Sequence, residues 1–289
     1  MQRRFFSLTN WLPRAAALAL LTALALTGQA TLAQAPTPTS QAARAAQTPT
    51  APRTPAPQRT PTPAAGQAAK PTAKDACGNA YQPVVAKAQW QYEIKNPPKD
   101  APLKLGSRYT DTLSQVSGST ATMERVYAKP SDAEKETEQW ECRNGAIVAA
   151  PAAGQKFPLE PGVFFNITSV KSEGVSVPAN PKPGDTWSQT VRIMGTIQVG
   201  NQSLNAELQF KTACKAARME TVTVPAGRFD ALRVDCTRET RGKASQGGTS
   251  QEFPPSTEET KSWLAVGIGL VKSTSPDTGE VNLLKYSLP

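Results

Sequence analysis

The chain has 289 residues, with 32 basic and 23 acidic side chains and no histidine. The lack of histidine excludes the Ser-His-Asp and Cys-His nucleophile systems and removes the commonest metal ligand. The formal net charge of +9 belongs mainly to residues 1–74, which carry eight basic and no acidic side chains, leaving 24 basic and 23 acidic ones for the rest. The folded part therefore has no overall charge that would draw it to nucleic acid.

The first 33 residues have the order of a secretory signal peptide. Arg3 and Arg4 precede an apolar run from Ala15 to Leu26, and small residues follow. As a helix this run rises about 18 Å, which is too short to span a bilayer. We expect cleavage after Ala30 or Ala33 and export to the periplasm, the cell surface or the medium, with no membrane span left. The arginine pair keeps a twin-arginine route open.

Residues 34–74 are mainly Ala, Pro, Thr and Gln, with nine prolines and no aromatic or acidic side chain. Such a composition cannot bury enough apolar surface to offset the entropy of ordering. We predict a disordered, locally extended linker, whose Thr-Pro repeats would be a plain spacer or a glycosylated stretch that crosses a cell-wall layer. The folded domain is predicted to cover residues 75–289.

Within this domain, apolar side chains recur with period two between Gly, Pro, Asn and Asp, a pattern typical of antiparallel strands. We predict strands at Trp90–Ile94, 108–116, 120–128, up to Cys142, 147–148, 162–170, 186–199, 202–211, 221–224, 228–236, 257–264, 270–275 and 280–288. The pattern predicts a mobile polar loop over 238–255. Residues 131–139 have a capping-box-like start without an apolar stripe, so they would form one or two helical turns at most.

About ten strands with almost no helix predict an all-β domain. A sheet of that length rarely stays flat, because it curls or splits into two layers. We expect a single strongly curved antiparallel sheet, a half-barrel or an open barrel.

The stretch TVTVPAGRFDALRVDC, from Thr221 to Cys236, predicts a hairpin. A three-residue loop of Pro225, Ala226 and Gly227 would place the even-numbered valines on one face, with Val224 opposite Arg228. Proline suits the first loop position, and Gly227 would take a positive φ. Phe229 would then lie on the other face, as packing or as the lining of a cavity.

Four cysteines in an exported chain favour two disulfides. The hairpin register puts Cys236 opposite Ala216, within reach of Cys214, so we favour Cys214 with Cys236 and Cys77 with Cys142 among three possible pairings. A zinc site is the alternative, but no CxxC spacing occurs. We therefore expect neither metal nor cofactor.

The stretch WLAVGIGLVK reads as a strand that turns at Gly267 and Gly269, although glycines also let backbone approach a ligand closely. No catalytic constellation is recognisable, because adjacent carboxylates such as Glu258 and Glu259 point to opposite faces of a strand. A Ser-Lys arrangement stays open as an alternative, but we expect no enzyme.

The sequences VPAGRFDAL and WLAVGIGLVK, preceded by GDTW, carry a resemblance to a family. The chain resembles uncharacterised exported bacterial β-proteins with the pattern V-P-A-G-x-F-[DE]-A-L and then W-x-A-x-G-[VI]-G-L-V-K, over about residues 178–289. The resemblance implies export and a curved half-barrel similar to that of lipoprotein-localisation factors and mycobacterial lipid-binding proteins. It implies no catalytic residue.

Together these features predict a non-enzymatic exported protein that binds or shields an apolar ligand, such as a lipid or lipoprotein chain. A half-open barrel leaves one sheet face without a partner layer, and an apolar ligand can supply that layer. The candidate ligand residues are Trp90, Tyr92, Trp187, Phe229 and Trp263, each with core packing as the alternative. The rival function is a structural or protein-interaction module of the cell envelope.

Overall fold

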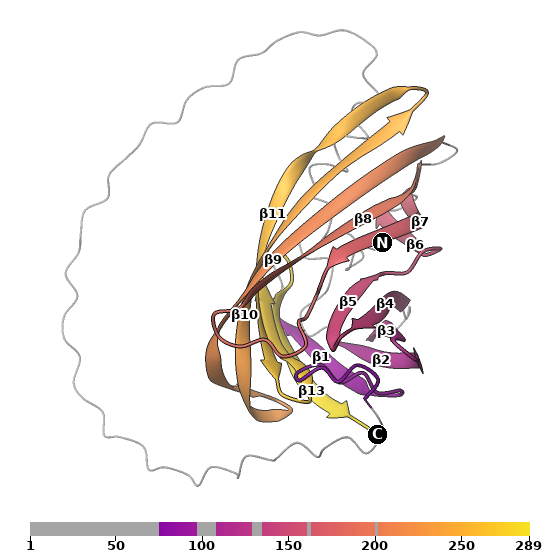
Figure 1. The fold of residues 1–289 in the computed structure, drawn as a ribbon. Coiled ribbons are helices and arrows are strands. Elements are labelled where there is room, and N and C mark those ends of the chain that lie inside the picture. Colours follow the sequence, from indigo (N-terminus) through magenta and orange to yellow (C-terminus); the bar gives the residue numbers. More distant parts are fainter. Residues whose placement is uncertain (1–74, 97–107, 129–134, 161–162, 200–201) are drawn as a thin grey trace, which may run out of the picture.

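The computed structural model describes residues 75–96, 108–128, 135–160, 163–199 and 202–289. The predicted signal peptide and linker lie outside these residues. In the described part, strands are the only regular elements, and thirteen of them form one antiparallel sheet in the order β5-β4-β3-β2-β1-β13-β12-β11-β10-β9-β8-β7-β6 (Figure 1). Their bounds are β1 (Gln89–Lys95), β2 (Arg108–Ser117), β3 (Thr120–Ala128), β4 (Lys135–Arg143), β5 (Ala146–Pro151), β6 (Lys156–Glu160), β7 (Val163–Gly174), β8 (Thr186–Val199), β9 (Gln202–Val224), β10 (Gly227–Gln246), β11 (Thr249–Ala265), β12 (Gly269–Ser275) and β13 (Gly279–Ser287).

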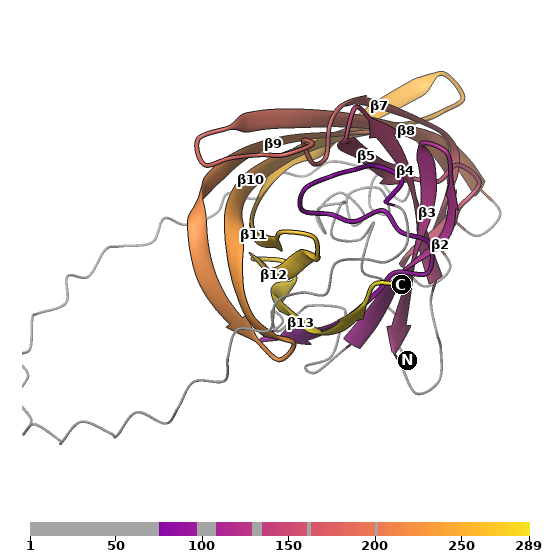
Figure 2. The same ribbon diagram turned by 60° about the horizontal axis from the view of Figure 1, so that its bottom comes forward.

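The sheet curls until its two ends approach each other, as Figure 2 shows. At one end, Ile147 of β5 forms an isolated bridge with Val177, which follows β7. The predicted fold class, one strongly curved antiparallel sheet, is confirmed, although the sheet has thirteen strands where we expected about ten. The short β6 is one strand that the sequence pattern did not indicate.

The predicted loop over residues 238–255 is wrong. β10 and β11 continue through it and pair up to Gln246 and Thr249, where Gly247 and Gly248 make the turn with positive φ. The segment looks like a loop because most of its side chains are polar and exposed, yet one face still carries buried Ala244 and Phe253. The long β9 supplies the ladder that holds it, which a local pattern cannot reveal.

The predicted helical turns at residues 131–139 are also wrong for the described part. Residues from Lys135 onward form β4, which pairs with β3 and places Trp140 opposite Ala121. Pairing on both sides outweighs the weak helical signal, because the segment has no apolar stripe with which a helix could pack.

The register of the predicted hairpin needs correction. Gly227 pairs with Val224, so the loop has two residues, and Phe229 lies opposite Val222 on the same face rather than on the other one. Gly227 has a positive φ of 140°, as the turn chemistry indicated. The three-residue loop was predicted from the alternation of even-numbered residues, and that prediction assumed that the β9–β10 ladder has no bulge.

The interruption is a register shift further along the same hairpin. Arg233 pairs with Arg218, but Val234 pairs with Ala216, so β9 has one extra residue. After the shift Cys236 lies directly opposite Cys214, and the structure joins the two in a disulfide with a Cα–Cα distance of 4.1 Å. A bulge of this kind moves every later residue to a new partner.

The second disulfide joins Cys77 to Cys142, with a Cα–Cα distance of 5.3 Å. Cys77 belongs to the segment of residues 75–88, which precedes β1 and runs inside the curled sheet (Figure 2). The bond therefore ties this internal segment to β4. The first disulfide thus joins two long neighbouring strands, β9 and β10, and the second joins two elements that are far apart in the sequence.

Residues 75–88 and the turn between β11 and β12 cover the concave face at one end of the sheet. Gly267 N donates to Ala80 O at 2.9 Å, which links these two segments. The apolar side chains buried at this end of the sheet form two clusters, which we together call the proximal core: Val84, Val85, Ala88, Trp90, Tyr92, Ile94, Tyr109, Leu113, Ala121, Met123, Tyr127, Ile147, Val224, Phe229, Ala231, Ala265, Ile268, Val271, Val281 and Leu283 in the first, and Tyr81, Cys214, Ala216, Leu232, Val234 and Leu264 in the second.

Candidate functional site

A second apolar cluster occupies the concave face toward the β10–β11 turn. We call it the distal cluster, and its buried members are Phe165, Ile167, Val191, Ile193, Ile197, Leu204, Ala206, Leu208, Phe210, Ala244 and Phe253. They alternate along β7 to β11, and on β9 they continue the same face that carries Cys214 and Ala216 in the proximal core. The distal cluster therefore shares the concave face with the part of the proximal core that contains Cys214 and Ala216.

Two glycines let the rings of the distal cluster lie flat against the sheet. A Cβ on Gly195 would come within 2.9 Å of the Phe165 ring and would collide with the carbonyl oxygen of Asn166. A Cβ on Gly242 would come within 2.6 Å of Leu208 and 2.8 Å of Phe253. Glycine in a strand often marks such a close approach.

The distal cluster differs from the proximal core in what covers it. Its buried members all come from five neighbouring strands, and Ala150 of β5 is the one apolar residue packed against it from elsewhere in the described chain. The proximal core, by contrast, has residues 75–88 as a second layer. The members of the distal cluster are nevertheless at most 8% exposed, so most of their surface is already out of contact with water.

A row of polar side chains crosses the concave face between the two apolar regions. We call it the polar belt: Gln189 of β8 pairs with Thr212 of β9, Thr212 with Arg238 of β10, and Arg238 with Glu258 of β11. All four are half-buried, whereas the distal cluster beside them is buried. Polar groups inside a curved sheet cost free energy unless they are satisfied, so the belt is a candidate binding region.

Gln189 has a structural role within this belt. Its Nε2 donates to Ala149 O at 2.7 Å and to Ser172 Oγ at 2.9 Å, and its Oε1 accepts a hydrogen bond from Ser176 Oγ at 2.9 Å. These bonds hold β5 against β7 and β8. Gln189 therefore helps to close the sheet. The charged residues of the polar belt, Arg238 and Glu258, lie on β10 and β11.

The charged end is a long ion pair between β10 and β11. Arg238 Nη1 lies 3.8 Å from Glu258 Oε2, with 30% and 15% of the two side chains exposed. Burial lowers the pKa of Arg238, and attraction by Glu258 and by Glu138 of β4 opposes that shift. Burial raises the pKa of Glu258; Arg238 opposes this shift, Asp277 adds to it, and a hydrogen bond from Ser275 opposes it. For each group the cost of burial exceeds the attraction, a signature of functional sites.

A second ion pair on the concave face is closed. Arg125 donates from Nε and Nη2 to the two carboxylate oxygens of Asp111 at 2.7 and 2.8 Å, and its guanidinium lies 4.4 Å from the centre of the Tyr109 ring. Burial lowers the pKa of Arg125, but Asp111 and Tyr109 outweigh it and raise the pKa overall. This bidentate pair satisfies itself and belongs to the packing of β2 and β3.

Three of the predicted ligand residues lie in the proximal core. Trp90 Nε1 donates to Ile268 O at 2.6 Å, and the Tyr92 hydroxyl donates to Leu270 O at 3.0 Å. The Phe229 ring meets Tyr286 edge to face, with centroids 6.3 Å apart. In all three, contacts with this chain occupy the part of the side chain that a ligand would need.

The other two predicted ligand residues are half-buried at separate places. Trp187 Nε1 donates to Ser176 O at 3.0 Å, and its side chain packs against the proximal core. Trp263 Nε1 donates to Glu220 Oε2 at 2.9 Å, and Lys272 Nζ lies 5.6 Å from its ring centre. The structure does not bring the five predicted residues together, and none belongs to the distal cluster.

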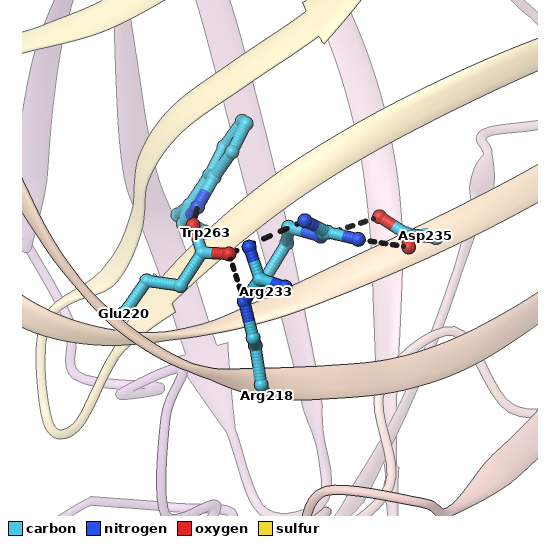
Figure 3. A network of polar contacts seen from close by, with 5 residues as sticks. All are labelled: Arg218, Glu220, Arg233, Asp235 and Trp263. Carbon is cyan, nitrogen blue, oxygen red and sulfur yellow. Dashed lines mark hydrogen bonds and ion pairs between the residues drawn. The ribbon is translucent and has the colours of Figure 1, made fainter.

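The surroundings of Trp263 form a network of ion pairs, shown in Figure 3. Glu220 accepts hydrogen bonds from Arg218 Nε at 2.7 Å and Arg233 Nη1 at 3.2 Å, and Arg233 also pairs with Asp235 at 2.8 Å. The donation from Trp263, followed by the two arginines, lowers the pKa of Glu220. With 67% of the Arg218 side chain exposed, this network is a solvated surface feature of modest energy.

The turn glycines serve packing within the chain. Gly267 and Gly269 have φ values of 68° and 100°, and a Cβ on Gly269 would collide with the side-chain amide of Gln82. The close backbone approach that these glycines suggested is thus made to residues 75–88. Pro225 lies in the two-residue loop, where the following Ala226 N donates to Leu283 O at 3.0 Å.

A hollow of about 770 Å³ lies at the part of β8 to β11 that contains the Cys214–Cys236 disulfide. Exposed polar residues such as Lys215, Thr237 and Lys261 line it. Apolar residues, among them Trp187 and Ala213, line it as well.

Sequence reasoning missed the polar belt and part of the distal cluster. The alternation of Leu204, Leu208 and Phe210 was visible, but Phe253 and Arg238 fell within the predicted loop. A lone phenylalanine before two prolines in an otherwise polar stretch was the available signal. In the described residues, no helix has the length and apolar character needed to cross a membrane.

Comparison with known proteins finds one family model that matches part of the chain. The sequence model of a family described as DUF3108-like matches residues 166–282, which run from β7 into β13 and include the polar belt. A search of curated proteins finds no match.

Two solved structures are similar to this chain. A predicted exported protein with a YmcC-like fold from Bacteroides fragilis is 15% identical over 72% of this chain and 99% of its own, with a TM-score of 0.43. A predicted lipoprotein from Parabacteroides distasonis is 16% identical over 72% and 99%, with a TM-score of 0.44.

Proposed function

We propose that this chain is an exported, non-enzymatic protein that holds an apolar ligand, a lipid or an acyl chain, against the distal cluster. One observation carries the proposal: a large apolar sheet face whose described cover from outside its own strands is Ala150. An apolar ligand would add to the cover of this face, as ligands do in curved and barrel-like sheets. The predicted signal peptide supports export.

The dimensions of the face suit an extended chain. Leu204 and Phe210, at the two ends of the cluster on β9, are six residues apart, about 20 Å along a strand. That length matches a long acyl group lying parallel to the strands. Similarity to lipoprotein-localisation factors, implied by the sequence motifs, would agree with such a ligand and stays a prediction.

The test is extraction of the purified exported protein with organic solvent, followed by mass spectrometry. We expect an acyl-bearing molecule to co-purify, and the extracted protein to take up an apolar fluorescent probe. Ile193→Gln places an amide in the distal cluster and should weaken uptake, whereas Met194→Gln, at a 44% exposed neighbour, should not. A folded protein that neither retains nor binds an apolar molecule would favour the structural or protein-interaction module instead.

A further inference from the structure

The distal cluster is so well buried that a ligand can reach it only when part of the surrounding structure moves. Its buried members are at most 8% exposed. At the other end of the interior, residues 75–88 form a second layer in which Val84 and Val85 are completely buried. A route through the wall of the curled sheet beside the distal cluster avoids that filled end.

The wall contains a seam between β5 and β7. At one end of the seam β6 pairs with β7, and at the other end Ile147 forms its bridge with Val177. Between these points, no main-chain hydrogen bond of the described chain joins residues 148–153 to residues 168–175. Residues 148–153 correspond to about 20 Å of strand, so the seam is about as long as the distal cluster is along β9.

Side chains hold this seam in place of a ladder. Gln189 Nε2 donates to Ala149 O at 2.7 Å and to Ser172 Oγ at 2.9 Å, while Ala149 N donates to Ser176 Oγ at 2.8 Å. We call Gln189, Ser172 and Ser176 the latch. A ladder separates only when successive main-chain bonds break, whereas rotation of the latch side chains frees Ala149. Such a segment opens locally at a lower free energy than a fully paired strand.

The seam borders the distal cluster from both of its sides. Ala150 on the β5 side and Val170 on the β7 side each pack against the cluster. Parting the seam would therefore separate these two residues and expose the cluster along its length. An acyl chain could then enter parallel to the strands, in the direction in which the cluster extends.

From this arrangement we propose that the seam is a lateral gate, through which an apolar ligand enters and leaves the distal cluster, and that Gln189 is its main latch residue. The ligand passes between β5 and β7, and the latch bonds form again behind it. The inference rests on the proposed function, because it takes the distal cluster as the ligand's site. Since the latch is closed in both the free and the loaded protein, it sets the rates of entry and exit and leaves the affinity unchanged.

Stopped-flow fluorescence with an apolar probe tests the latch, using the full exported chain after solvent extraction. Gln189→Ala removes the bonds that this side chain makes across the seam. We expect probe entry and release to accelerate together by about fivefold, as the loss of one net hydrogen bond gives, with Kd unchanged. Gln198→Ala, at an exposed position of the same strand, is the matched control and should change neither rate. Unchanged rates in the Gln189→Ala protein, or a change in Kd without a change in the entry rate, would overturn the gate.

A cross-link gives the opposite perturbation. All four native cysteines are in disulfides, so Ala149→Cys combined with Ser176→Cys supplies the only free thiols, at positions already in contact. A short bifunctional thiol reagent that joins them should slow probe entry by at least about tenfold, and probe loaded before linking should stay bound. The same double variant without the reagent is the control. Entry as fast in the linked protein as in the unlinked one would contradict the proposal.

Hydrogen exchange without ligand separates the gate from the function beneath it. Amides of residues 148–153 and 168–175 should exchange faster than those of residues 205–215 in β9, and Gln189→Ala should accelerate exchange at the seam alone. Equal exchange in the three segments would overturn the latch. If the probe binds but neither the variant nor the cross-link alters its rates, the gate is wrong and the apolar site stands. If the probe does not bind, the proposed function itself fails. Circular dichroism identifies misfolding, and if Gln189→Ala does not fold, the cross-link decides.

Discussion

Replacing Gly242 by alanine tests how tightly the distal cluster is packed. The new Cβ would come within 2.6 Å of Leu208 Cδ2, 2.8 Å of Phe253 Cδ2 and 3.0 Å of Glu207 O. Carbon atoms in contact prefer about 3.5–4.0 Å, so both side chains would have to move by about 1 Å. Leu208 is fully buried and Phe253 is 8% exposed, so neither has free space into which to retreat.

The expected loss follows from two opposing effects. Overpacking of a core costs about 1–3 kcal/mol. Replacing glycine by alanine stabilises by about 0.4–1 kcal/mol through the unfolded chain, provided that the native φ suits alanine. Gly242 is not among the positive-φ glycines, so this gain applies. The Gly242→Ala protein should therefore lose about 1–2 kcal/mol of unfolding free energy.

Equilibrium urea unfolding, followed by tryptophan fluorescence with the disulfides intact, measures the loss. Leu208→Ala alone should cost about 2–5 kcal/mol. The double variant should be more stable than the sum of the two losses by at least about 1 kcal/mol, because the added methyl group then occupies vacated space. Gln246→Ala, at an exposed position of the same strand, is the control. A neutral Gly242→Ala protein, or additive losses, would refute the packing argument.

Three further predictions concern stability. Replacing Cys214 and Cys236 together by alanine should cost about 3 kcal/mol, the value for a closed loop of this length, and a loss below about 1 kcal/mol in urea unfolding would contradict it. Asp111→Asn should cost about 3 kcal/mol in the same assay, because the half-buried Arg125 loses its partner; an unchanged midpoint would disprove this. Glu220→Gln should cost less than about 1 kcal/mol at pH 7. A lowered carboxyl pKa stabilises above the unfolded value of about 4.3, so this difference should vanish as the pH falls through the lowered native pKa; a deficit that persists at pH 2 would contradict the assignment.

Most strands could be predicted from the sequence because a sheet with one buried face has apolar residues at every second position. Trp90, Tyr92 and Ile94 alternate as predicted and all enter the proximal core. Where the same alternation is broken by a bulge, the pattern misleads. The extra residue in β9 lies outside the turn from which the register was read, and it changes the partner of Cys236.

The candidate site was harder to predict because it depends on residues brought together by the curl of the sheet. The aromatic residues chosen from sequence are large and apolar, and such residues most often fill a core. Arg238 stood in a polar stretch with no local sign of burial. Its proximity to Glu138 arises only because β4 and β10 face each other across the interior.

The β5 edge also bears on how the chain avoids self-association through this strand. Ile147 N donates to Val177 O at 2.8 Å, Ala149 N donates to Ser176 Oγ at 2.8 Å, and Ala149 O accepts from Gln189. An exposed edge strand offers these same backbone groups as a template for another chain. With its edge occupied by its own chain, β5 cannot seed strand addition between copies, which would protect the protein outside the reach of cytoplasmic chaperones.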